Sequence, residues 1–403
     1  MEKLPDGWKR VKLGEVLEET KERNHRNLYF NVFTISNNSG LILQDEFFGR
    51  LLASKNTRNY KIVRYLHFAY NPARINVGSI ALNETSLTGI ISPMYIVFKT
   101  HKDKLIPKFF KYYTQTKRFN NQVISNTAGS VREVLNYSAL MTFDFLLPPL
   151  PEQQKIAEIL ETVDNAIEKT DKIIEKYKRI KQGLMQELLT KGIDEEGNIR
   201  SEKTHKFKDS PVGRIPVEWE VVKLGEVIKY EQPWKYIVRN EKYDPKHGVP
   251  VLTAGKTFIL GYTDETTGIY ENVPAIIFDD FTTESRFVNF PFKVKSSALK
   301  ILKPANNNIN LFFVFNLLQT ITLKPGSEHK RFWISEYSKI DIPFPPFPEQ
   351  QRIAEILSQV DKAIEKEQNY KEKLRRLKQG LMEDLLTGKV RVNNLIEVGK
   401  NDV

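Results

Sequence analysis

The sequence predicts an α+β protein in which two globular mixed α/β domains are separated by two long helices that form an antiparallel coiled coil. Three observations support this prediction. An internal duplication gives the chain a pseudo-two-fold internal repeat, two segments carry heptad periodicity, and short strand candidates occupy the remaining regions. The length of 403 residues also exceeds what one ordinary hydrophobic core organises, so we expect at least two domains.

The duplication is strongest in two helical segments. The sequence PPLPEQQKIAEIL at 148–160 recurs as PPFPEQQRIAEIL at 345–357, and IKQGLMQELLT at 180–190 recurs as LKQGLMEDLLT at 377–387. The offset is 197 residues throughout, and 28 of the 43 positions in 148–190 are identical in the second copy. This degree of identity indicates duplication of one unit and not a chance similarity of composition.

A shorter motif, which we call the opening motif, starts each half of the chain. It reads LPDGWKRVKLGEV at 4–16 and IPVEWEVVKLGEV at 215–227, with an offset of 211 residues. Because this offset differs from that of the helical segments, the variable stretch between opening motif and helix is 14 residues shorter in the second half. The chain therefore combines two similar frames with two dissimilar middle regions.

Each helical segment carries the pattern of a coiled-coil seam, with spacings that alternate between four and three residues. In the first segment the seam positions are Ile156, Leu160, Val163, Ile167, Thr170, Ile174, Tyr177, Lys181, Leu184 and Leu188. In the second they are Ile353, Leu357, Val360, Ile364, Glu367, Lys371, Leu374, Lys378, Leu381 and Leu385. A helix of about 40 residues at about 1.5 Å per residue is a rod of roughly 60 Å.

The order of the segments along the chain predicts the direction of the two helices. The first helix carries the chain from the first middle region to the second opening motif, and the repeat implies that the second helix returns it to the first opening motif. The helices would then be antiparallel, and the chain termini would lie close together. The alternative is that each helix only packs on its own domain.

The middle regions contain candidates for both strands and helices. Short apolar runs bounded by Gly, Asn or Pro indicate strands at 32–36, 78–82, 94–99, 250–254 and 274–281. Helices are expected at 107–116 and 310–320. The expected organisation is a first domain at 1–150, a spacer helix at 151–190, a linker at 191–214, a second domain at 215–347, a spacer helix at 348–388 and a short, loose C-terminal tail at 389–403.

The positive charge of the chain is concentrated in its first part. The formal net charge is +11, of which residues 1–150 contribute +9 with 21 Lys and Arg against 12 Asp and Glu, whereas 216–347 contribute only +1. No acidic residue occurs at 47–83, 104–132 or 285–327, and each of these windows contains six cations among Asn and aromatic residues. Such windows suit phosphate contacts combined with base-edge contacts, although an ordinary solvated surface has the same composition.

The sequence lacks the motifs of common catalytic and cofactor sites. It contains no cysteine, which excludes disulfides and thiolate chemistry and fits a reducing compartment, and it contains no P-loop or glycine-rich dinucleotide motif. Its six histidines show no metal-ligand spacing, and Asp279, Asp280 and Glu284 are better interpreted as a turn than as a magnesium site. No apolar run approaches membrane-spanning length. We therefore expect no cofactor, no metal, no membrane partner and a cytoplasmic location.

Three repeated motifs together resemble the specificity (S) subunit of a type I restriction–modification system: the PPLPEQQKIAEIL segment, the helix end IKQGLMQELLT, and the W-x-x-V-K-L-G-E-V opening motif. They cover about 110 residues. The resemblance implies that each middle region is a target-recognition domain that reads one half of a bipartite, asymmetric double-stranded DNA target. It further implies that the helices set the spacer and dock two methyltransferase (M) subunits, and that restriction/translocase (R) subunits join this core. The S subunit itself would be non-catalytic.

The resemblance also implies a structural or partner-facing role for the most similar helix positions. In the first helical segment these are Pro151, Glu152, Gln153, Gln154, Gly183, Leu184 and Met185. In the second they are Pro348, Glu349, Gln350, Gln351, Gly380, Leu381 and Met382.

Candidate DNA contacts are residues that combine charge with aromatic or hydrogen-bonding reach. In the first domain they are Arg50, Lys55, Arg58, Tyr60, Arg64 and Arg132. In the second domain they are Arg286, Lys330, Arg331 and Trp333. The matching dipeptides Gly129-Ser130 and Gly326-Ser327 precede Arg132 and the last three of these residues, so we expect the same loop to touch DNA in both halves.

Two functions of other classes remain open from the sequence. A self-contained DNA-modifying enzyme is disfavoured because no cofactor motif is present. A coiled-coil scaffold without a nucleic-acid role is disfavoured by the three acid-free windows. The sequence thus favours recognition of DNA sequence without catalysis.

Overall fold

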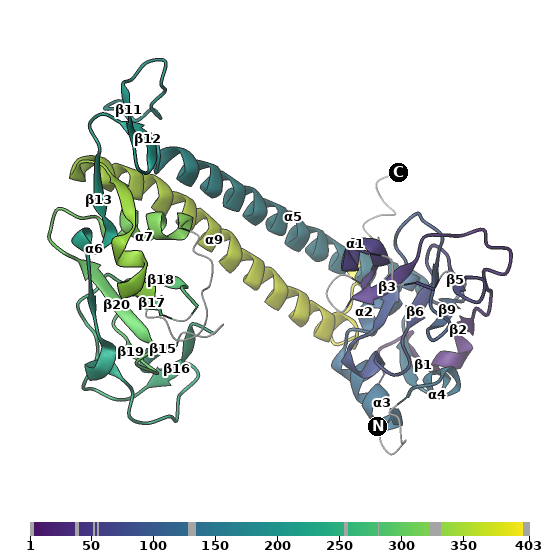
Figure 1. The fold of residues 1–403 in the computed structure, drawn as a ribbon. Helices are drawn as coiled ribbons and strands as arrows, with labels where there is room; N and C mark the ends of the chain where they lie inside the picture. The colour runs from purple at the N-terminus through teal and green to yellow at the C-terminus, as the bar shows by residue number, and fades with distance from the viewer. Residues whose placement is uncertain are drawn as a thin grey trace. The chain divides into compact units, whose positions relative to one another are not determined.

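The computed structural model describes residues 4–397 except 37–39, 51–52, 55, 128–133, 254–256, 281 and 322–331. The chain divides into two compact units. Unit 1 consists of Met1–Asp171 and Asn369–Val403, and unit 2 consists of Lys172–Gln368. Each unit therefore contains one opening motif, one middle region and part of each long helix (Figure 1).

Unit 1 contains the first opening motif, the first middle region and the start of the helix that follows them. Its strands are β1 (Lys9–Lys12), β2 (Leu17–Glu19), β3 (Phe33–Ser36), β4 (Gly40–Leu43), β5 (Lys61–Val63), β6 (Phe68–Tyr70), β7 (Ile80–Leu82), β8 (Gly89–Ile91), β9 (Ile96–Thr100) and β10 (Asp144–Leu147). Its helices are η1 (Leu13–Glu15), α1 (Gln44–Phe48), η2 (Ile75–Val77), α2 (Pro107–Tyr113), α3 (Lys117–Thr127) and α4 (Tyr137–Met141), followed by the start of α5 (Leu150–Leu188).

Unit 2 is likewise built from strands and short helices that precede a long helix. Its strands are β11 (Phe207–Ser210), β12 (Gly213–Pro216), β13 (Glu220–Lys223), β14 (Ile228–Glu231), β15 (Val249–Leu252), β16 (Ile259–Thr263), β17 (Ala275–Asp279), β18 (Ser285–Val288), β19 (Lys293–Val294), β20 (Leu299–Pro304) and β21 (Asp341–Phe344). Its helices are α6 (Leu224–Val227), η3 (Pro233–Tyr236), α7 (Leu311–Thr320), α8 (Phe332–Ser335) and η4 (Tyr337–Lys339), followed by the start of α9 (Phe347–Leu385).

The two units share the strand order of their four-stranded sheets, although their middle regions are dissimilar in sequence. Unit 1 has a four-stranded sheet of order β2-β9-β6-β7, and unit 2 has one of order β14-β20-β17-β18. The opening motif also makes the same pairing in each unit, because β1 pairs with β10 and β13 pairs with β21 directly before the long helix. The duplication therefore extends to the four-stranded sheet, whereas the other strands of the variable regions pair differently, as β3-β4 and β5-β8 in unit 1 and as β16-β15-β19 in unit 2.

Aromatic residues fill the cores of both units. In unit 1, Phe68 of β6 and Phe98 of β9 stack with ring centroids 5.1 Å apart, and Phe110 of α2 packs edge-on against both rings. In unit 2, Phe278 of β17 packs edge-on against Tyr337 of η4. The strand and helix predictions for the middle regions are confirmed, since the expected ranges overlap β3, β7, β9, β15, β17, α2 and α7.

The two predicted spacer helices are continuous, and they are α5 and α9. The predicted seam is also confirmed, because each of its positions is buried or half-buried in both helices. The described part of the chain includes no helix that is long and apolar enough to cross a membrane.

Ion pairs in unit 1 show that the helices run antiparallel. The Nζ atom of Lys378 on α9 lies 2.7 Å from Oδ1 of Asp164 on α5, and Lys371 pairs with Asp171. One step of seven residues forward on α5 thus corresponds to seven residues backward on α9. The alternative in which each helix packs only on its own domain is therefore wrong.

A third ion pair, in unit 2, repeats one of the first two. The Nζ atom of Lys181 on α5 lies 2.7 Å from Oδ1 of Asp361 on α9. Lys378 follows Lys181 by 197 positions, and Asp361 follows Asp164 by the same number, so the pair is the repeat equivalent of the Asp164–Lys378 pair. Each lysine that interrupts the apolar seam therefore forms an ion pair with an aspartate on the facing helix.

The linker and the tail are more ordered than the sequence predicts. Strands β11 and β12 form an antiparallel hairpin at the end of the expected linker. In the tail, the guanidinium of Arg391 donates to Glu152, Val392 is buried in the core of unit 1, and helix α10 (Asn393–Glu397) follows. The expectation of a loose tail is wrong for 389–397, because the tail supplies partners to the start of α5.

Candidate nucleic-acid interface

In unit 1 the first acid-free window lies beside a second basic segment, residues 20–32. Arg23 of this segment donates to the carbonyl oxygen of Asn59 over 2.7 Å. The backbone N–H of Asn24 donates to the carbonyl oxygen of Tyr60 over 2.9 Å. The two segments, distant in sequence, therefore form one surface.

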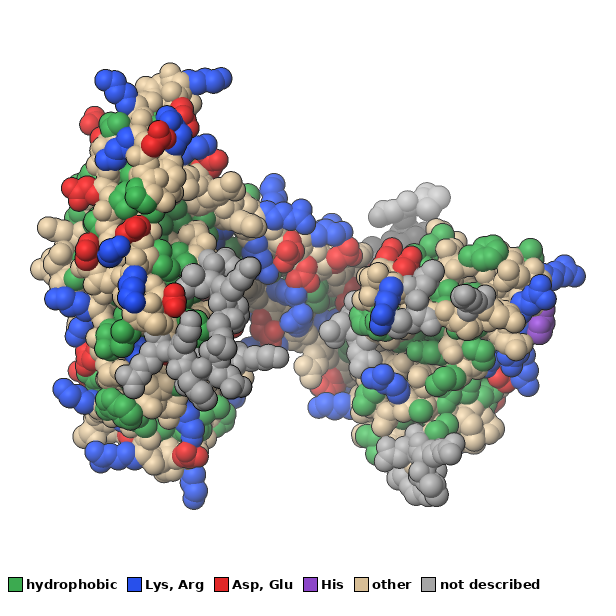
Figure 2. All heavy atoms as spheres, viewed as in Figure 1, with side chains coloured by type: hydrophobic (Ala, Val, Ile, Leu, Met, Phe, Trp, Pro, Cys, Tyr) green, Lys and Arg blue, Asp and Glu red, His purple; other side chains and the backbone are tan. Residues whose placement is uncertain are grey.

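An ion pair joins the same two segments. The guanidinium of Arg64 donates to both carboxylate oxygens of Glu22, over 3.2 and 2.6 Å. We call the surface formed by residues 20–32 and 56–64 the basic edge of unit 1. Figure 2 shows Lys, Arg and a His side chain at the margin of unit 1 where Figure 1 labels β2 and β5.

The cations of the basic edge affect one another. Burial lowers the pKa of the Lys61 ammonium below its ordinary value, and the charges of Arg23 and Lys21 lower it further against the opposing effect of Glu19. Independently of this shift, several cations gathered on one surface attract anions. Phosphate groups of a nucleic acid are the anions that such a surface suits.

The predicted contacts of unit 1 differ in their accessibility. Arg50 and Arg58 are exposed, so their side chains are free to reach a polyanion. Tyr60 is half-buried, and its hydroxyl oxygen accepts a hydrogen bond from a backbone N–H. Lys55 and Arg132 lie outside the described residues.

The structure corrects one of the contacts predicted for unit 2. Arg286 lies on β18 with an exposed side chain, whereas Lys330 and Arg331 lie outside the described residues. Trp333 is only 1% exposed, and its ring packs edge-on against Phe278 at a centroid distance of 5.5 Å. The prediction that Trp333 reaches DNA is wrong, because short helix α8 turns its indole into the hydrophobic core.

The described part of the acid-free window 285–327, residues 285–321, does not form a free basic surface. Each of its cations in the described part of the chain pairs with a carboxylate from outside the window. Lys300 and Asp280 form a buried pair at 3.1 Å, and buried Lys293 pairs at 3.0 Å with half-buried Glu265. Because strand pairing brings acids from 231–284 against this window, an acid-free sequence does not predict an acid-free surface.

Residues 20–32 of the basic edge are not among the DNA contacts predicted from the sequence. The stretch KERNHRN at 21–27 contains three cations and a histidine, which is a signal for a polyanion site. This stretch is not an acid-free window, because Glu22 lies within it. In the structure Glu22 forms an ion pair with Arg64 within the basic edge.

The repeated Glu and Gln at the start of α5 hold the fold of unit 1. The carboxylate of Glu152 accepts hydrogen bonds from the indole N–H of Trp8 over 2.9 Å and from Nε of Arg391 over 2.7 Å. The side-chain oxygen of Gln153 accepts from the backbone N–H of Ile106 over 2.8 Å. Both residues are buried, and these hydrogen bonds hold the first turn of α5 to the rest of unit 1.

The equivalent residues of α9 make the same contacts in unit 2. The carboxylate of Glu349 accepts from the indole N–H of Trp219 over 3.1 Å and from the guanidinium of Arg200. The side-chain oxygen of Gln350 accepts from the backbone N–H of Asn310 over 2.9 Å. The four flanking residues, in contrast, are exposed: Pro151, Gln154, Pro348 and Gln351.

The repeated residues near the ends of the helices include two glycines without a packing reason. Gly183 and Gly380 are exposed, and a side chain at either position would meet no atom within 4 Å. Their neighbours are half-buried and pack against the cores: Leu184, Met185, Leu381 and Met382. A glycine inside a helix costs about 0.5–1 kcal/mol relative to alanine, and no contact in the described part of the chain requires a glycine at either position.

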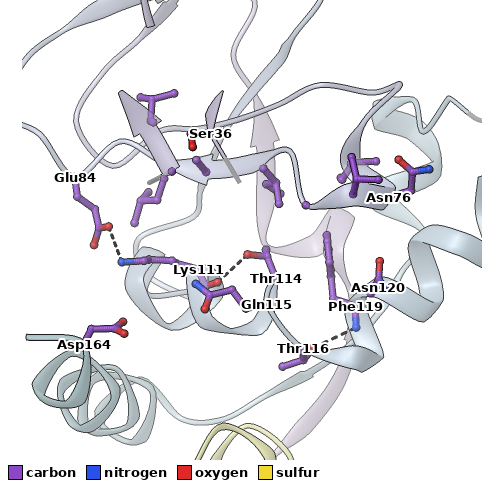
Figure 3. A pocket seen from close by; sticks show the side chains of 18 of the residues that line it. Ser36, Asn76, Glu84, Lys111, Thr114, Gln115, Thr116, Phe119, Asn120 and Asp164 are labelled. Atoms are coloured by element: carbon purple, nitrogen blue, oxygen red, sulfur yellow. Dashed lines mark hydrogen bonds and ion pairs between the residues drawn. The ribbon is translucent and has the colours of Figure 1, made fainter. Parts of the chain in front are cut away.

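A cavity of about 860 Å³ in unit 1 lies between β7, the turn that joins α2 to α3, and the long helices (Figure 3). Figure 3 shows Glu84 and Lys111 pointing toward one another, 2.6 Å apart, and Asp164 pairs with Lys378 at 2.7 Å. No histidine is among the residues that line it, so the described lining offers no free acid–base pair. Among the described residues, no group of His, Asp and Glu is arranged to hold a metal ion.

Two regions of the chain, 5–178 and 216–376, match the family model of the type I restriction modification DNA specificity domain. The chain belongs to the type I restriction–modification specificity subunits. Each match starts in an opening motif and ends in a long helix, so one copy of the domain corresponds to each half of the repeat. As a specificity subunit, the chain recognises DNA sequence within a type I restriction–modification complex.

Curated relatives of this specificity subunit come from a bacterium and an archaeon. The EcoR124I/EcoR124II specificity subunit of Escherichia coli is 44% identical over 200 residues, which are 46% of this chain and 49% of that one, so the match spans about half its length. The putative MjaX specificity subunit of Methanocaldococcus jannaschii is 28% identical over 415 residues, 96% of this chain and 95% of that one. The MjaVIII specificity subunit of the same organism is 30% identical and aligns with 79% of this chain and 78% of its own.

Solved structures share the fold. The type I restriction–modification S subunit from M. genitalium has a TM-score of 0.60 at 15% identity, with 95% of this chain and 97% of that one covered. A chain from a study of complex assembly in a type I restriction–modification system has a TM-score of 0.52 at 20% identity, with 97% and 100% covered. The predicted architecture of two mixed domains and two long antiparallel helices is thereby confirmed.

Proposed function

We propose that this specificity subunit reads a bipartite, asymmetric double-stranded DNA target and that the recognition domain of each unit reads one half. The observation that carries the proposal is the common strand order of the two four-stranded sheets on dissimilar sequences. One frame that presents two sets of side chains suits two different half-sites. The charges agree with this difference, since the first domain carries +9 over 1–150 and the second +1 over 216–347.

The same proposal makes the subunit non-catalytic, without a cofactor, and active in the cytoplasm. Support comes from the absence of cofactor motifs in the sequence and from the paired carboxylates of the cavity in unit 1. Chemistry on DNA would then belong to partner subunits, two methyltransferase (M) subunits and the restriction/translocase (R) subunits that join the core.

The long helices would set the separation between the half-sites. Apolar seam residues and the Lys–Asp pairs specify one register of α5 against α9. A fixed register makes the helix pair a spacer of defined length, at about 1.5 Å per residue.

The docking surface for the methyltransferase subunits would be the exposed side of each helix around its glycine. In unit 2, α5 exposes Ile173 and Ile180 near Gly183. In unit 1, α9 exposes Tyr370 and Leu377, which are the repeat equivalents of these two residues. Equivalent apolar surfaces at both copies of the repeat suit two copies of one partner.

A domain exchange tests the proposal. Residues 17–128 are replaced by the corresponding stretch of a related subunit with another target, and methylation of a library of bipartite sites by the assembled complex is sequenced. We expect a changed first half-site with an unchanged second half-site and an unchanged gap. Altered recognition at both halves, or at neither, contradicts independent reading by the two domains.

A further inference from the structure

Each recognition domain exposes large apolar side chains in one particular connection. Three of the four most exposed large apolar residues in the described part of the chain are Phe30 at 70%, Trp234 at 65% and Leu28 at 63%. Phe30 and Leu28 lie between β2 and β3 of unit 1, and Trp234 lies between β14 and β15 of unit 2. We call the segments 20–32 and 232–248 the first connections of the two domains.

The first connections are equivalent in the fold. Each leaves an edge strand of a four-stranded sheet, β2 in the order β2-β9-β6-β7 and β14 in the order β14-β20-β17-β18. Each is the first segment after the opening motif and its short strand. No sequence alignment relates the two segments, so only the structure reveals this equivalence.

In unit 1 the backbone holds Leu28 and Phe30 outward. The buried side chain of Asn24 organises the loop, because its oxygen accepts from the N–H of Leu28 over 2.9 Å and its amide donates to the carbonyl of Tyr29 over 2.8 Å. Tyr29, between the two exposed residues, packs inward against the cluster that contains Ile62. Exposure of Leu28 and Phe30 is thus imposed by a built loop.

In unit 2 a different set of contacts gives the same result. Trp234 lies in the single turn η3, whose first residue, Pro233, is buried. The last residue of the turn, Tyr236, packs edge-on against Tyr270 at 5.0 Å and donates its hydroxyl to Glu231 over 2.9 Å. The indole of Trp234 therefore projects from a turn that is fixed at both ends.

The charge of the two connections is equal although the charge of the two domains is not. Residues 20–32 contain three cations and one acid, and 232–248 contain four cations and two acids, so each carries +2. The second domain is nearly neutral over 216–347, and within it this connection is locally positive. Arg239, Lys242 and Lys246 are exposed within it.

From these observations we infer that the first connection of each domain contacts the DNA half-site, with Phe30 and Leu28 or Trp234 packed on base edges between phosphates held by the neighbouring cations. The inference rests on the proposed DNA-reading function and adds the residues that read. Positive charge favours DNA over a basic or neutral protein surface as the occupant, and the membership in a DNA-specificity family favours DNA over an acidic protein. A fixed, exposed aromatic side chain beside cations provides the apolar contact that a thymine methyl or an unstacked base step accepts.

The test uses the full chain assembled with its methyltransferase subunits and a duplex that carries the site methylated in the host genome. Trp234→Ala should weaken binding roughly tenfold and leave the salt dependence of binding unchanged. Arg239→Ala should weaken binding and reduce the slope of log K against log salt by about one. Leu260→Ala, an exposed apolar residue on β16 of the same domain, serves as the matched control and should change neither quantity.

Half-site specificity provides the second readout. The loss caused by Trp234→Ala should disappear on a duplex whose second half-site is replaced, and the loss caused by Phe30→Ala should disappear when the first is replaced, with Ile124→Ala as control in unit 1. Unchanged affinity of Trp234→Ala and Phe30→Ala overturns the inference while leaving the DNA-reading proposal intact. Loss of the methyltransferase subunits from the Trp234→Ala complex in sedimentation also overturns it, because the surface would then belong to a protein partner. Failure of the unmodified complex to prefer its site would instead contradict the proposed function.

Discussion

The carboxylate of Glu349 at the first turn of α9 supports a sharp prediction about stability. It accepts hydrogen bonds from the indole N–H of Trp219 over 3.1 Å, from the backbone N–H of Ile193 over 2.9 Å and from the guanidinium of Arg200. The side chains of Arg200 and Glu349 are only 12% and 10% exposed. Glu349→Ala would leave a charged group and two N–H donors buried without their acceptor.

The magnitude follows from the groups left behind. Removal of one partner of a buried ion pair costs about 3–5 kcal/mol, so we expect Glu349→Ala to lower the free energy of unfolding of unit 2 by this amount. Glu349→Gln keeps one acceptor oxygen but loses the charge. Because hydrogen bonds to a charged group contribute about 1.5–3 kcal/mol, we expect this variant to lower the free energy of unfolding of unit 2 by about that amount. Trp219→Phe removes a single donor and should cost less than Glu349→Ala.

The assay is urea-dependent hydrogen exchange of the full chain, with peptides of the two units measured separately. Peptides that cover β14 and β20 should lose protection in the Glu349 variants in the order Ala, then Gln. Gln351→Ala, an exposed position two residues further along α9, is the matched control and should resemble the unmodified protein. A loss below about 1 kcal/mol for Glu349→Ala, or the same loss for Gln351→Ala, refutes the role of the buried carboxylate.

Three further predictions concern the spacer, the docking surface and pH. One heptad added to each helix, near Asp171 and Gln368, should lengthen the rod by about 10 Å and widen the preferred gap by at most about three base pairs, measured by methylation of a gap library; an unchanged gap with activity retained contradicts the spacer. Gly183→Leu should fold normally because the site is open, yet weaken binding of one methyltransferase subunit in sedimentation, whereas Lys178→Leu on another face should not. Burial, and then neighbouring cations, lower the pKa of His67, so the unfolded chain binds its proton first and unit 1 should lose stability as pH falls from about 6.5 toward the lowered folded pKa. His67→Gln should flatten that decline in thermal unfolding, and an equal decline in the variant contradicts the assignment.

Elements set by local pattern were predictable from the sequence. The seam positions from Ile156 to Leu188 follow a period that only a helix satisfies, and the structure makes α5 continuous over this stretch. The short apolar runs near Phe33 and Ile276 likewise became β3 and β17. In these cases the neighbours that decide the structure lie within a few residues along the chain.

Features set by long-range pairing were not predictable. Lys300 appears in the sequence as one cation of an acid-free window, but its partner Asp280 reaches it only through the pairing of β17 with β20. Trp333 appears as an aromatic beside two cations, but α8 packs it against Phe278. Arg391 appears in a polar tail, and its partner Glu152 lies 239 positions away. A charge or aromatic pattern gives the chemistry of a side chain but not the surface to which it belongs.

Two of the three described ion pairs between the long helices are equivalent under the duplication, and the third has no equivalent. The Asp164–Lys378 and Lys181–Asp361 pairs are equivalent under the offset of 197 residues. Because each of the two helical segments supplies one Asp and one Lys at these positions, the same pairs would also form between two identical segments. They specify an antiparallel register, but not which segment lies opposite which.

The Asp171–Lys371 pair supplies that missing distinction. Its repeat equivalents are Gln368 and Ile174, which cannot form an ion pair. In the same antiparallel register, two copies of the first segment would place Asp171 opposite Ile174, and two copies of the second would place Lys371 opposite Gln368. A partly exposed pair contributes at most about 1 kcal/mol, so its effect lies in the choice of partner more than in stability. Divergence at these four positions therefore favours pairing between the two different halves of the chain over pairing between like halves.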